Sequence, residues 1–425
     1  MPVKDVDNLV LAGSPDSVDK LNAQFYTRFP YPWRALKFDY LENPYFDTIM
    51  LNQDVGAWHG EVVPRRPEIW IAGCGTNQAI FKALRFPQAR VLGSDVSAGS
   101  LEICSESAKQ LDVFNLELKQ ESINEISYKD QFDYIVSTGV IHHNADPQAT
   151  LRRIAGALKP SGILELMVYN RFHWTIPAAF QKAVRILSGD DGGVDFESSL
   201  TLAKAIINEV SQDTSIGVVA GYRDYSDAML ADELLQPVLH SYTVESLADM
   251  AESCGLEIVL PCLNQFDRAE QRWSWNMEFK NKSLQAIYES LPDVRRWQVT
   301  NLLLRAASPQ LWFYLQRKDA GRKRKSEREV CDEFLATRFT RTSTAQRGYI
   351  QNDNGKYRLL SGSIPYPSTP PHESVRKIFD AVDETRPLRS TFEKLGIEPT
   401  FSTVSKARML LCTSEFPYLS ASSGR

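Results

Sequence analysis

The segment Glu68-Ile-Trp-Ile-Ala-Gly-Cys-Gly-Thr-Asn-Gln78 is followed along the chain by Val91-Leu-Gly-Ser-Asp-Val-Ser97. In the first segment an apolar run breaks at Gly73-x-Gly75, and in the second an apolar run ends at the carboxylate of Asp95. Glycines let the backbone turn sharply and approach a ligand, and a carboxylate after the next strand accepts hydrogen bonds from ribose hydroxyls. The two segments therefore predict a βαβ unit that binds a nucleoside.

The turn between these two strands does not suit a diphosphate. A dinucleotide-binding turn carries a third glycine where this chain has Gln78, which is preceded by Asn77. The turn also lacks Lys, Arg and the Lys-Ser or Lys-Thr pair of a P-loop. A ligand with a ribose and no phosphate fits better, and S-adenosylmethionine is the common ligand of that kind.

Three further segments extend the predicted sheet. Residues 116–123 indicate a third strand that ends near Glu121, where an adenine amino group can be held. Residues 132–147 are typical of a fourth strand and its exit loop, and residues 163–169 of a buried fifth strand. Together with the helical spacing at 151–158, this alternation predicts an α/β fold.

With these motifs in order, the chain resembles the class I S-adenosylmethionine-dependent methyltransferases. It is most similar to a bacterial group whose fourth strand ends in Gly-Val-Leu/Ile-His-His-x-x-Asp-Pro, here Gly139 to Pro147. Motif I of the family is matched by Ala72-Gly-Cys-Gly-Thr76, its ribose acid by Asp95 and its adenine-side acid by Glu121. The chain departs from the wider family at Asn77, where many members carry a third glycine.

The resemblance implies a Rossmann-like, seven-stranded methyltransferase sheet with S-adenosylmethionine as the cofactor. We expect the cofactor to be bound by residues that follow the first four strands. These residues are Ala72, Gly73, Cys74, Gly75, Asn77, Asp95, Val96, Ser97, Glu121, Ser122, Ile123, Thr138 and Gly139.

The resembling fold closes with an antiparallel pair of strands, which we expect at 256–260 and 311–316. The methyltransferase domain then covers residues 59–318, with a mostly helical insertion at 171–240 between strands five and six. A second helical excursion is expected at 282–306.

The remaining parts of the chain flank this domain. Residues 1–58 are expected to form a helical, aromatic arm that either packs on the core or covers the site as a lid. A similar arm in the resembling family favours the lid. Residues 319–329 indicate a solvated, charged linker. Residues 330–425, with a hairpin turn at Asn354-Gly355, suggest a small α+β, winged-helix-like accessory domain at the C-terminal end.

Composition favours a cytoplasmic enzyme. The apolar fraction of 43% builds a sizeable core, and a net charge of −5 gives no general attraction to nucleic acid or to an acidic membrane. Six cysteines without a Cys-x-x-Cys pair argue against a metal site and against a disulfide framework. No secretory signal or membrane-spanning run is visible, so we expect no membrane partner. The net charge leads us to expect no nucleic-acid partner either.

Methyl transfer from a sulfonium needs a positioned acceptor and the exclusion of water, and a general base helps with a hydroxyl or protonated amine. His142 and His143 follow the fourth strand, where such sheets place substrate chemistry. Of the two, His143 is expected to face the pocket as the base and His142 to be structural. Tyr169 and Asn170, at the end of strand five, are candidates for orienting the acceptor, and Tyr169 is equally expected in the core.

The aromatic arm supplies further candidates. Tyr26 and Trp33 are expected to contact the substrate, and Tyr26 or Arg28 to reach the carboxylate of the cofactor. The simplest role of the Cys74 side chain is to fill space between the motif glycines.

Three functions remain open at this point. The first is methylation of a small molecule at oxygen, nitrogen or carbon, in a pocket closed by the arm and the insertion, as in secondary metabolism. The second is a protein or peptide methyltransferase of the lysine type that presents its substrate on the C-terminal domain. The third is a module that binds the cofactor without turnover. We expect a small-molecule or peptide substrate and consider a homodimer; the sequence does not select the acceptor atom.

Overall fold

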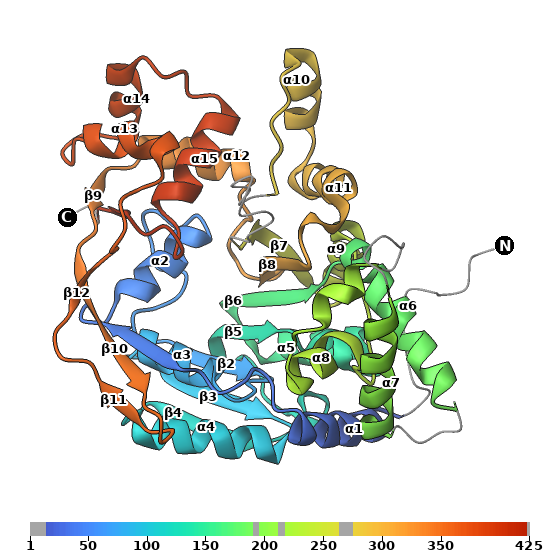
Figure 1. The fold of residues 1–425 in the computed structure, drawn as a ribbon. Coiled ribbons are helices and arrows are strands. Elements are labelled where there is room, and N and C mark those ends of the chain that lie inside the picture. Colours follow the sequence, from blue (N-terminus) through green and yellow to red (C-terminus); the bar gives the residue numbers. More distant parts are fainter. Residues whose placement is uncertain (1–13, 190–194, 211–216, 263–274, 423–425) are drawn as a thin grey trace.

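The computed structural model describes residues 14–189, 195–210, 217–262 and 275–422 of the chain (Figure 1). Its centre is a sheet made of β2 (Glu68–Ala72), β3 (Arg90–Asp95), β4 (Leu116–Gln120), β5 (Phe132–Thr138), β6 (Leu158–Tyr169), β7 (Leu256–Pro261) and β8 (Gln310–Arg317). The seven strands lie in the order β4-β3-β2-β5-β6-β8-β7. Strands β2 to β6 pair in parallel, and β8 is antiparallel to both β6 and β7. The expected seven-stranded α/β fold is confirmed.

The central strands are mostly apolar and buried. In β2, Ile69, Trp70 and Ile71 have no exposed surface. Parallel sheets are packed by helices, so their strands form continuous apolar runs instead of alternating with polar residues. The helices that pack against this sheet are α3 (Gln78–Arg85), α4 (Ala98–Gln110), α5 (Pro147–Ala157) and α9 (Val244–Ser253).

Capping side chains fix the turns that follow the strands. The Ser97 hydroxyl accepts a hydrogen bond from the Ser100 N–H and starts α4, and the Asp146 carboxylate accepts from the Ala149 N–H and starts α5. Such caps satisfy N–H groups that a helix leaves unpaired in its first turn. Two short 3₁₀ helices, η1 (Ile123–Glu125) and η2 (Ile141–His143), lie in the same row of turns.

The insertion after β6 is helical, as expected. It contains α6 (Arg171–Leu187), α7 (Phe196–Glu209), η3 (Gly217–Tyr222) and α8 (Asp227–Leu234). These helices share a second hydrophobic core with α1 (Pro15–Arg28) of the N-terminal arm, in which Phe25 and Phe29 pack with Phe180, Leu200 and Leu230. Figure 1 shows α1, α6, α7 and α8 gathered at one end of the sheet. The arm and the insertion therefore form one cover.

The second excursion, between β7 and β8, is helical as well. It contains α10 (Lys282–Ser290), α11 (Asp293–Leu304) and η4 (Arg305–Ala307). Figure 1 shows α10 projecting from the body of the molecule.

The C-terminal region joins a strand of the arm. Its sheet pairs β10 (Thr344–Gln351) with β11 (Tyr357–Leu359), β12 (Ile364–Tyr366) and β1 (Lys37–Leu41), so the expected hairpin is present and its third partner comes from the arm. The other elements of these two regions are α2 (Phe46–Asp54), α12 (Glu327–Ala336), β9 (Phe339–Arg341), α13 (Glu373–Ala381), α14 (Arg389–Leu395), α15 (Phe401–Leu411) and β13 (Leu419–Ala421), which pairs with β9.

One hydrophobic core runs from the central sheet into the C-terminal helices. It includes Trp58, whose ring packs near those of Phe334 and Phe339. The Trp58 indole N–H also donates to the Val330 carbonyl at 3.2 Å. The division into domains at 59–318 and 330–425, and the winged-helix-like character of the latter, stay predictions, and the shared core shows that the two parts pack intimately.

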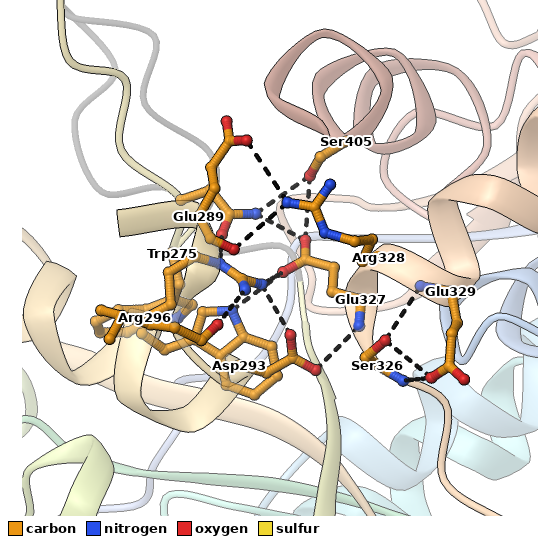
Figure 2. A network of polar contacts seen from close by, with 12 residues as sticks. Trp275, Glu289, Asp293, Arg296, Ser326, Glu327, Arg328, Glu329 and Ser405 are labelled. Atoms are coloured by element: carbon orange, nitrogen blue, oxygen red, sulfur yellow. Dashed lines mark hydrogen bonds and ion pairs between the residues drawn. The ribbon is translucent and has the colours of Figure 1, made fainter. Parts of the chain in front are cut away.

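A buried ionic network lies at this junction, and Figure 2 shows it from close by. Arg296 of α11 donates to Glu327 at 2.7 Å and to Asp293 at 3.0 Å, and each of the three side chains is at most 4% exposed. The Trp297 indole N–H donates to the same Glu327 carboxylate. The structure thus differs from the expected linker at 319–329, because residues 327–329 form the first turn of α12 and Glu327 is buried.

In the part of the chain that is described, no helix has both the length and the apolar character needed to cross a membrane.

Candidate active site

A cavity of about 700 Å³ opens at the carboxyl ends of β2, β3, β5 and β6. Ligand sites in open α/β sheets lie at this edge, and the volume is in the range of small-molecule sites. Three parts of the chain line it: the turns after the strands, α1 with the segment after it, and the insertion. The arm and the insertion thus form part of the cavity wall beside the Gly73 turn, and their role as a lid stays a prediction.

The two motif glycines are required by their backbone geometry. Gly73 has φ +79°, and a Cβ atom there would lie 2.4 Å from a methyl of Val140. Gly75 has φ +54°, and its Cβ would lie 2.6 Å from the carbonyl oxygen of Tyr31 in the arm. A side chain at either position is strained by the positive φ and has no space.

Two hydrogen bonds join the arm to the glycine turn, next to the close approach between Gly75 and Tyr31. The Asn77 amide donates to the Trp33 carbonyl at 3.1 Å, and the Thr76 hydroxyl donates to the Pro32 carbonyl. Asn77, at the position where many relatives have glycine, therefore ties the arm down. It also lines the cavity.

Asp95 lies at the end of β3, with its carboxylate held by the turns on both sides. One oxygen accepts from the Gly75 N–H and the other from the Ser97 N–H, each at 2.9 Å. Burial raises the pKa of Asp95, and these N–H groups oppose the shift. A carboxylate has about four lone-pair sites, so two remain for a ligand.

The turn after β4 is more crowded than expected. Glu121 lines the cavity, and its carboxylate accepts from the Tyr128 hydroxyl at 2.6 Å and pairs with Lys119 at 2.5 Å. Next to it, the Ser122 hydroxyl donates to Asp19 of α1. Asp19 is a carboxylate in the cavity wall that sequence reasoning missed, because it lies in the arm far from any motif.

The structure brings most of the expected cofactor residues together. Ten of them line the cavity: Gly73, Gly75, Asn77, Asp95, Val96, Glu121, Ser122, Ile123, Thr138 and Gly139. Ala72, Cys74 and Ser97 do not line it. Ala72 and Cys74 are buried behind the turn, and Ser97 is occupied as the cap of α4.

The two histidines have different surroundings. His143 lines the cavity, and its Nδ1–H donates to the Val238 carbonyl at 2.8 Å. This bond leaves the lone pair on Nε2. Burial lowers the pKa of His143 to about 4. His142 is fully buried, does not line the cavity, and packs between His143 and Tyr169.

Tyr169 and Asn170, adjacent in sequence, occupy different places. Tyr169 lines the cavity, and its ring stacks on Trp174 with centroids 3.7 Å apart and planes 8° apart. Asn170 is fully buried and caps α6: its amide donates to the carbonyls of Arg305 and Ser308, and its oxygen accepts from the Phe172 N–H. The expectation that Asn170 orients an acceptor is therefore corrected, because all of its polar atoms are used structurally.

In the arm, only Tyr26 takes the expected position. It lines the cavity and bonds to Gln236 of the insertion. Trp33 is about half exposed and does not line the cavity, which Tyr31 and Pro32 line instead. Arg28 is also corrected: it pairs with Glu197 on the surface at 2.5 Å and is absent from the cavity wall.

The insertion adds polar groups that sequence reasoning did not name. Asp232 and Glu233 of α8, with Tyr222 and Tyr225, line the cavity. Asp232 is buried and flanked in sequence by the buried Leu230, Ala231 and Leu234. The sequence signal that could have identified Asp232 is an acidic residue on the apolar face of a helix.

The charge of the cavity wall has one sign. Its described residues include five carboxyl groups, on Asp19, Asp95, Glu121, Asp232 and Glu233, and neither Lys nor Arg. Such a wall repels a diphosphate and suits a sulfonium cofactor of net positive charge. Among the described residues, no group of three or more His, Cys, Asp or Glu side chains is placed to hold a metal ion.

Comparisons with known proteins agree with this geometry. Residues 72–187 match the family model of a methyltransferase domain. Trans-aconitate 2-methyltransferase of Deinococcus radiodurans is 36% identical over 110 residues, which cover 25% of this chain and 40% of that protein. An uncharacterized protein of Synechococcus sp. is 26% identical over 302 residues, 69% of this chain and 70% of that protein.

Among solved structures, PKMT2 from Rickettsia typhi has a similar fold, with a TM-score of 0.55 and 15% identity. The superposition covers 90% of this chain and 76% of that chain, and PKMT2 has also been solved in complex with AdoHcy.

The sheet order, the glycine turn and the matched model together define a class I S-adenosylmethionine-dependent methyltransferase domain. The protein is an S-adenosylmethionine-dependent methyltransferase, and S-adenosylmethionine is its cofactor.

Proposed function

We propose that the protein methylates a small molecule enclosed between the sheet and the cover formed by the arm and the insertion. The observation that carries this proposal is the cavity itself. The turns that follow the strands and the cover line one continuous space of about 700 Å³. A site of this form surrounds its ligand and excludes water from the transfer step.

The cofactor half of the site is assigned to the turns of β2, β3, β4 and β5. Asp95 accepts hydrogen bonds from the ribose hydroxyls, and the backbone at Gly73 and Gly75 allows the close approach of the ligand. Glu121, with Ser122 and Ile123, holds the adenine edge. S-adenosylmethionine supplies a methyl group that is already activated on a sulfonium.

The acceptor half is assigned to His143, Tyr169 and Tyr26. His143 is the proposed base: its Nδ1–H is held by the Val238 carbonyl, so Nε2 is the atom that accepts a proton. Tyr169 lies in a fixed orientation on Trp174 and positions the acceptor. His142 supports both rings from behind and does not touch the substrate.

A second candidate is a protein or peptide methyltransferase. It is favoured by the likeness in fold to PKMT2, which covers 90% of the chain and so includes part of the C-terminal region as well as the methyltransferase domain. This likeness concerns the fold, and the acceptor is decided by experiment.

The test is a methyl-transfer assay with tritiated S-adenosylmethionine and a bacterial lysate, separated afterwards into protein and small-molecule pools. Omission of the enzyme and addition of excess S-adenosylhomocysteine are the controls. The proposal expects enzyme-dependent label in the small-molecule pool. Label confined to the protein pool supports the second candidate, and label in neither pool contradicts both.

A further inference from the structure

The acceptor side of the cavity contains two carboxyl groups that no Lys or Arg of the described residues neutralises. Asp232 and Glu233 lie next to each other on α8, and both line the cavity. Within the described ranges, neither residue takes part in an ion pair. Asp232 is 5% exposed, and its carboxylate accepts a hydrogen bond from the neutral amide of Gln236 at 2.7 Å. A buried charge in this situation is costly unless a partner arrives from outside.

A second observation points to a ligand at the same place. Tyr169 is 7% exposed and lines the cavity, and its hydroxyl has no hydrogen-bond partner among the described residues. Buried tyrosine hydroxyls are normally bonded. Tyr169 and Asp232 line the same cavity, and burial and the nearby charge of Asp232 raise the pKa of Tyr169.

The walls around the two acids are aromatic. Tyr169, whose ring packs between Trp174 and His142, contributes its hydroxyl to one wall, and Tyr222 lies edge-on to Tyr225 at 4.9 Å between centroids in another. Tyr26 lines the cavity from the arm. Aromatic faces attract a cation and acids neutralise it, and this combination recognises ammonium groups.

From this geometry, and resting on the proposed function, we propose that the methyl acceptor is an alkyl amine. It enters as an ammonium ion, is held by Asp232 and Glu233 within the aromatic walls, and is methylated on nitrogen.

The reaction balances with groups that are present. The ammonium, held by the two acids, first loses a proton to Nε2 of His143, the base of the proposed function, whose Nδ1–H donates to the Val238 carbonyl. The neutral amine nitrogen then forms a bond to the methyl carbon with its lone pair, while the bond between sulfur and methyl breaks and its electron pair stays on sulfur. The product is a methylated ammonium ion.

The same geometry argues against an anionic acceptor. A substrate carboxylate would enter a wall with five carboxyl groups and without Lys or Arg in its described part. Like charges at close range in a partly buried site repel each other strongly.

Binding is tested first, with the full-length protein saturated with S-adenosylhomocysteine. The probes are n-butylammonium chloride and 1-butanol, which have similar shapes and differ in charge. Calorimetry is expected to show n-butylammonium binding that is weakened about 10- to 100-fold by Asp232→Asn combined with Glu233→Gln. Asp227→Asn, on the same helix in an exposed pair with Lys204, is the control and is expected to change nothing. Equal binding of both probes, or equal binding by the double variant, overturns the proposal.

The affinity for S-adenosylhomocysteine alone separates the roles of the acids. The proposal expects it to be unchanged in the double variant. A loss of cofactor affinity in that variant would assign the two acids to the cofactor and overturn the amine proposal, while leaving the proposed function intact.

The chemical linkage of the transferred methyl group is the last readout. Label from the lysate assay is expected in N-methyl groups that survive acid hydrolysis in the small-molecule pool. N-methyl label confined to the protein pool shows an amine acceptor on a protein instead and contradicts the proposed small-molecule function. Label released as methanol by base, or retained as an ether, overturns the amine proposal and leaves a methyltransferase. Absence of label from both pools contradicts the proposed function, on which the amine proposal rests.

Discussion

Replacing Glu327 by alanine tests whether the C-terminal region is tied to the methyltransferase domain through the buried network. The substitution removes the carboxylate that pairs with Arg296 and accepts from Trp297, and it leaves Arg296 with Asp293 as its remaining acidic partner. Removing one member of a buried ion pair costs about 3–5 kcal/mol, because the other charge stays buried.

This cost translates into a shift in melting temperature. An unfolding entropy of about 2.1 cal/mol/K per residue, over 425 residues, amounts to about 0.9 kcal/mol/K. A loss of about 3–5 kcal/mol then lowers the melting temperature by about 3–6 °C. Differential scanning calorimetry measures this shift.

The matched control is Glu333→Ala on the same helix. Glu333 pairs with Lys325, and both side chains are 39% exposed. Exposed pairs contribute about 0–1 kcal/mol, so the control is expected to shift the melting temperature by about 1 °C or less. If Glu327→Ala and Glu333→Ala melt alike, the network does not stabilise the junction and the reasoning is refuted.

Four further predictions concern the site. Gly75→Ala is expected to weaken S-adenosylhomocysteine binding about tenfold or more, because the new methyl meets the Tyr31 carbonyl at a positive φ; calorimetry measures it, with Gly60→Ala, which has open space, as the control. His143→Ala is expected to lower turnover about 10²–10⁴-fold with cofactor affinity retained, and an equal loss of both would mark it as structural. The folded-state pKa of His143 is lowered from 6.5 to about 4. Its neutral form therefore contributes stability that is complete above pH 6.5 and is lost as the pH falls through 4. A His143→Gln variant whose acid unfolding profile equals that of the wild type contradicts this prediction. S-adenosylhomocysteine is expected to slow amide exchange in α1 and in 171–240, and protection confined to the Gly73 turn would remove the lid interpretation.

The sheet and the cofactor half of the site were accessible from sequence because their signals are local. Strands such as β2 are mostly apolar runs, and each turn places its glycine or carboxylate within a few residues of the strand end. Gly73, Gly75 and Asp95 therefore took their expected positions.

The acceptor half was less accessible because it is assembled from segments far apart in the chain. Asp19, Tyr26 and Asp232 meet only after the arm packs on the insertion, and no local pattern records that contact. Asn170 was misplaced because the end of a strand is also the start of a helix, and the cap took its side chain. The pairing of β1 with β10 is of the same long-range kind.

The central claim is that S-adenosylmethionine occupies this cavity with its ribose on Asp95, and calorimetric titration with S-adenosylhomocysteine tests it most directly. Wild-type protein is expected to bind, and Asp95→Ala is expected to weaken binding by about 1.5–3 kcal/mol, the range for hydrogen bonds to a charged group. Glu102→Ala, an exposed acid on the helix that follows Asp95, is the control for the change in charge and is expected to bind like the wild type. Undiminished affinity in Asp95→Ala, or tight binding of NAD by the wild type, would contradict the account.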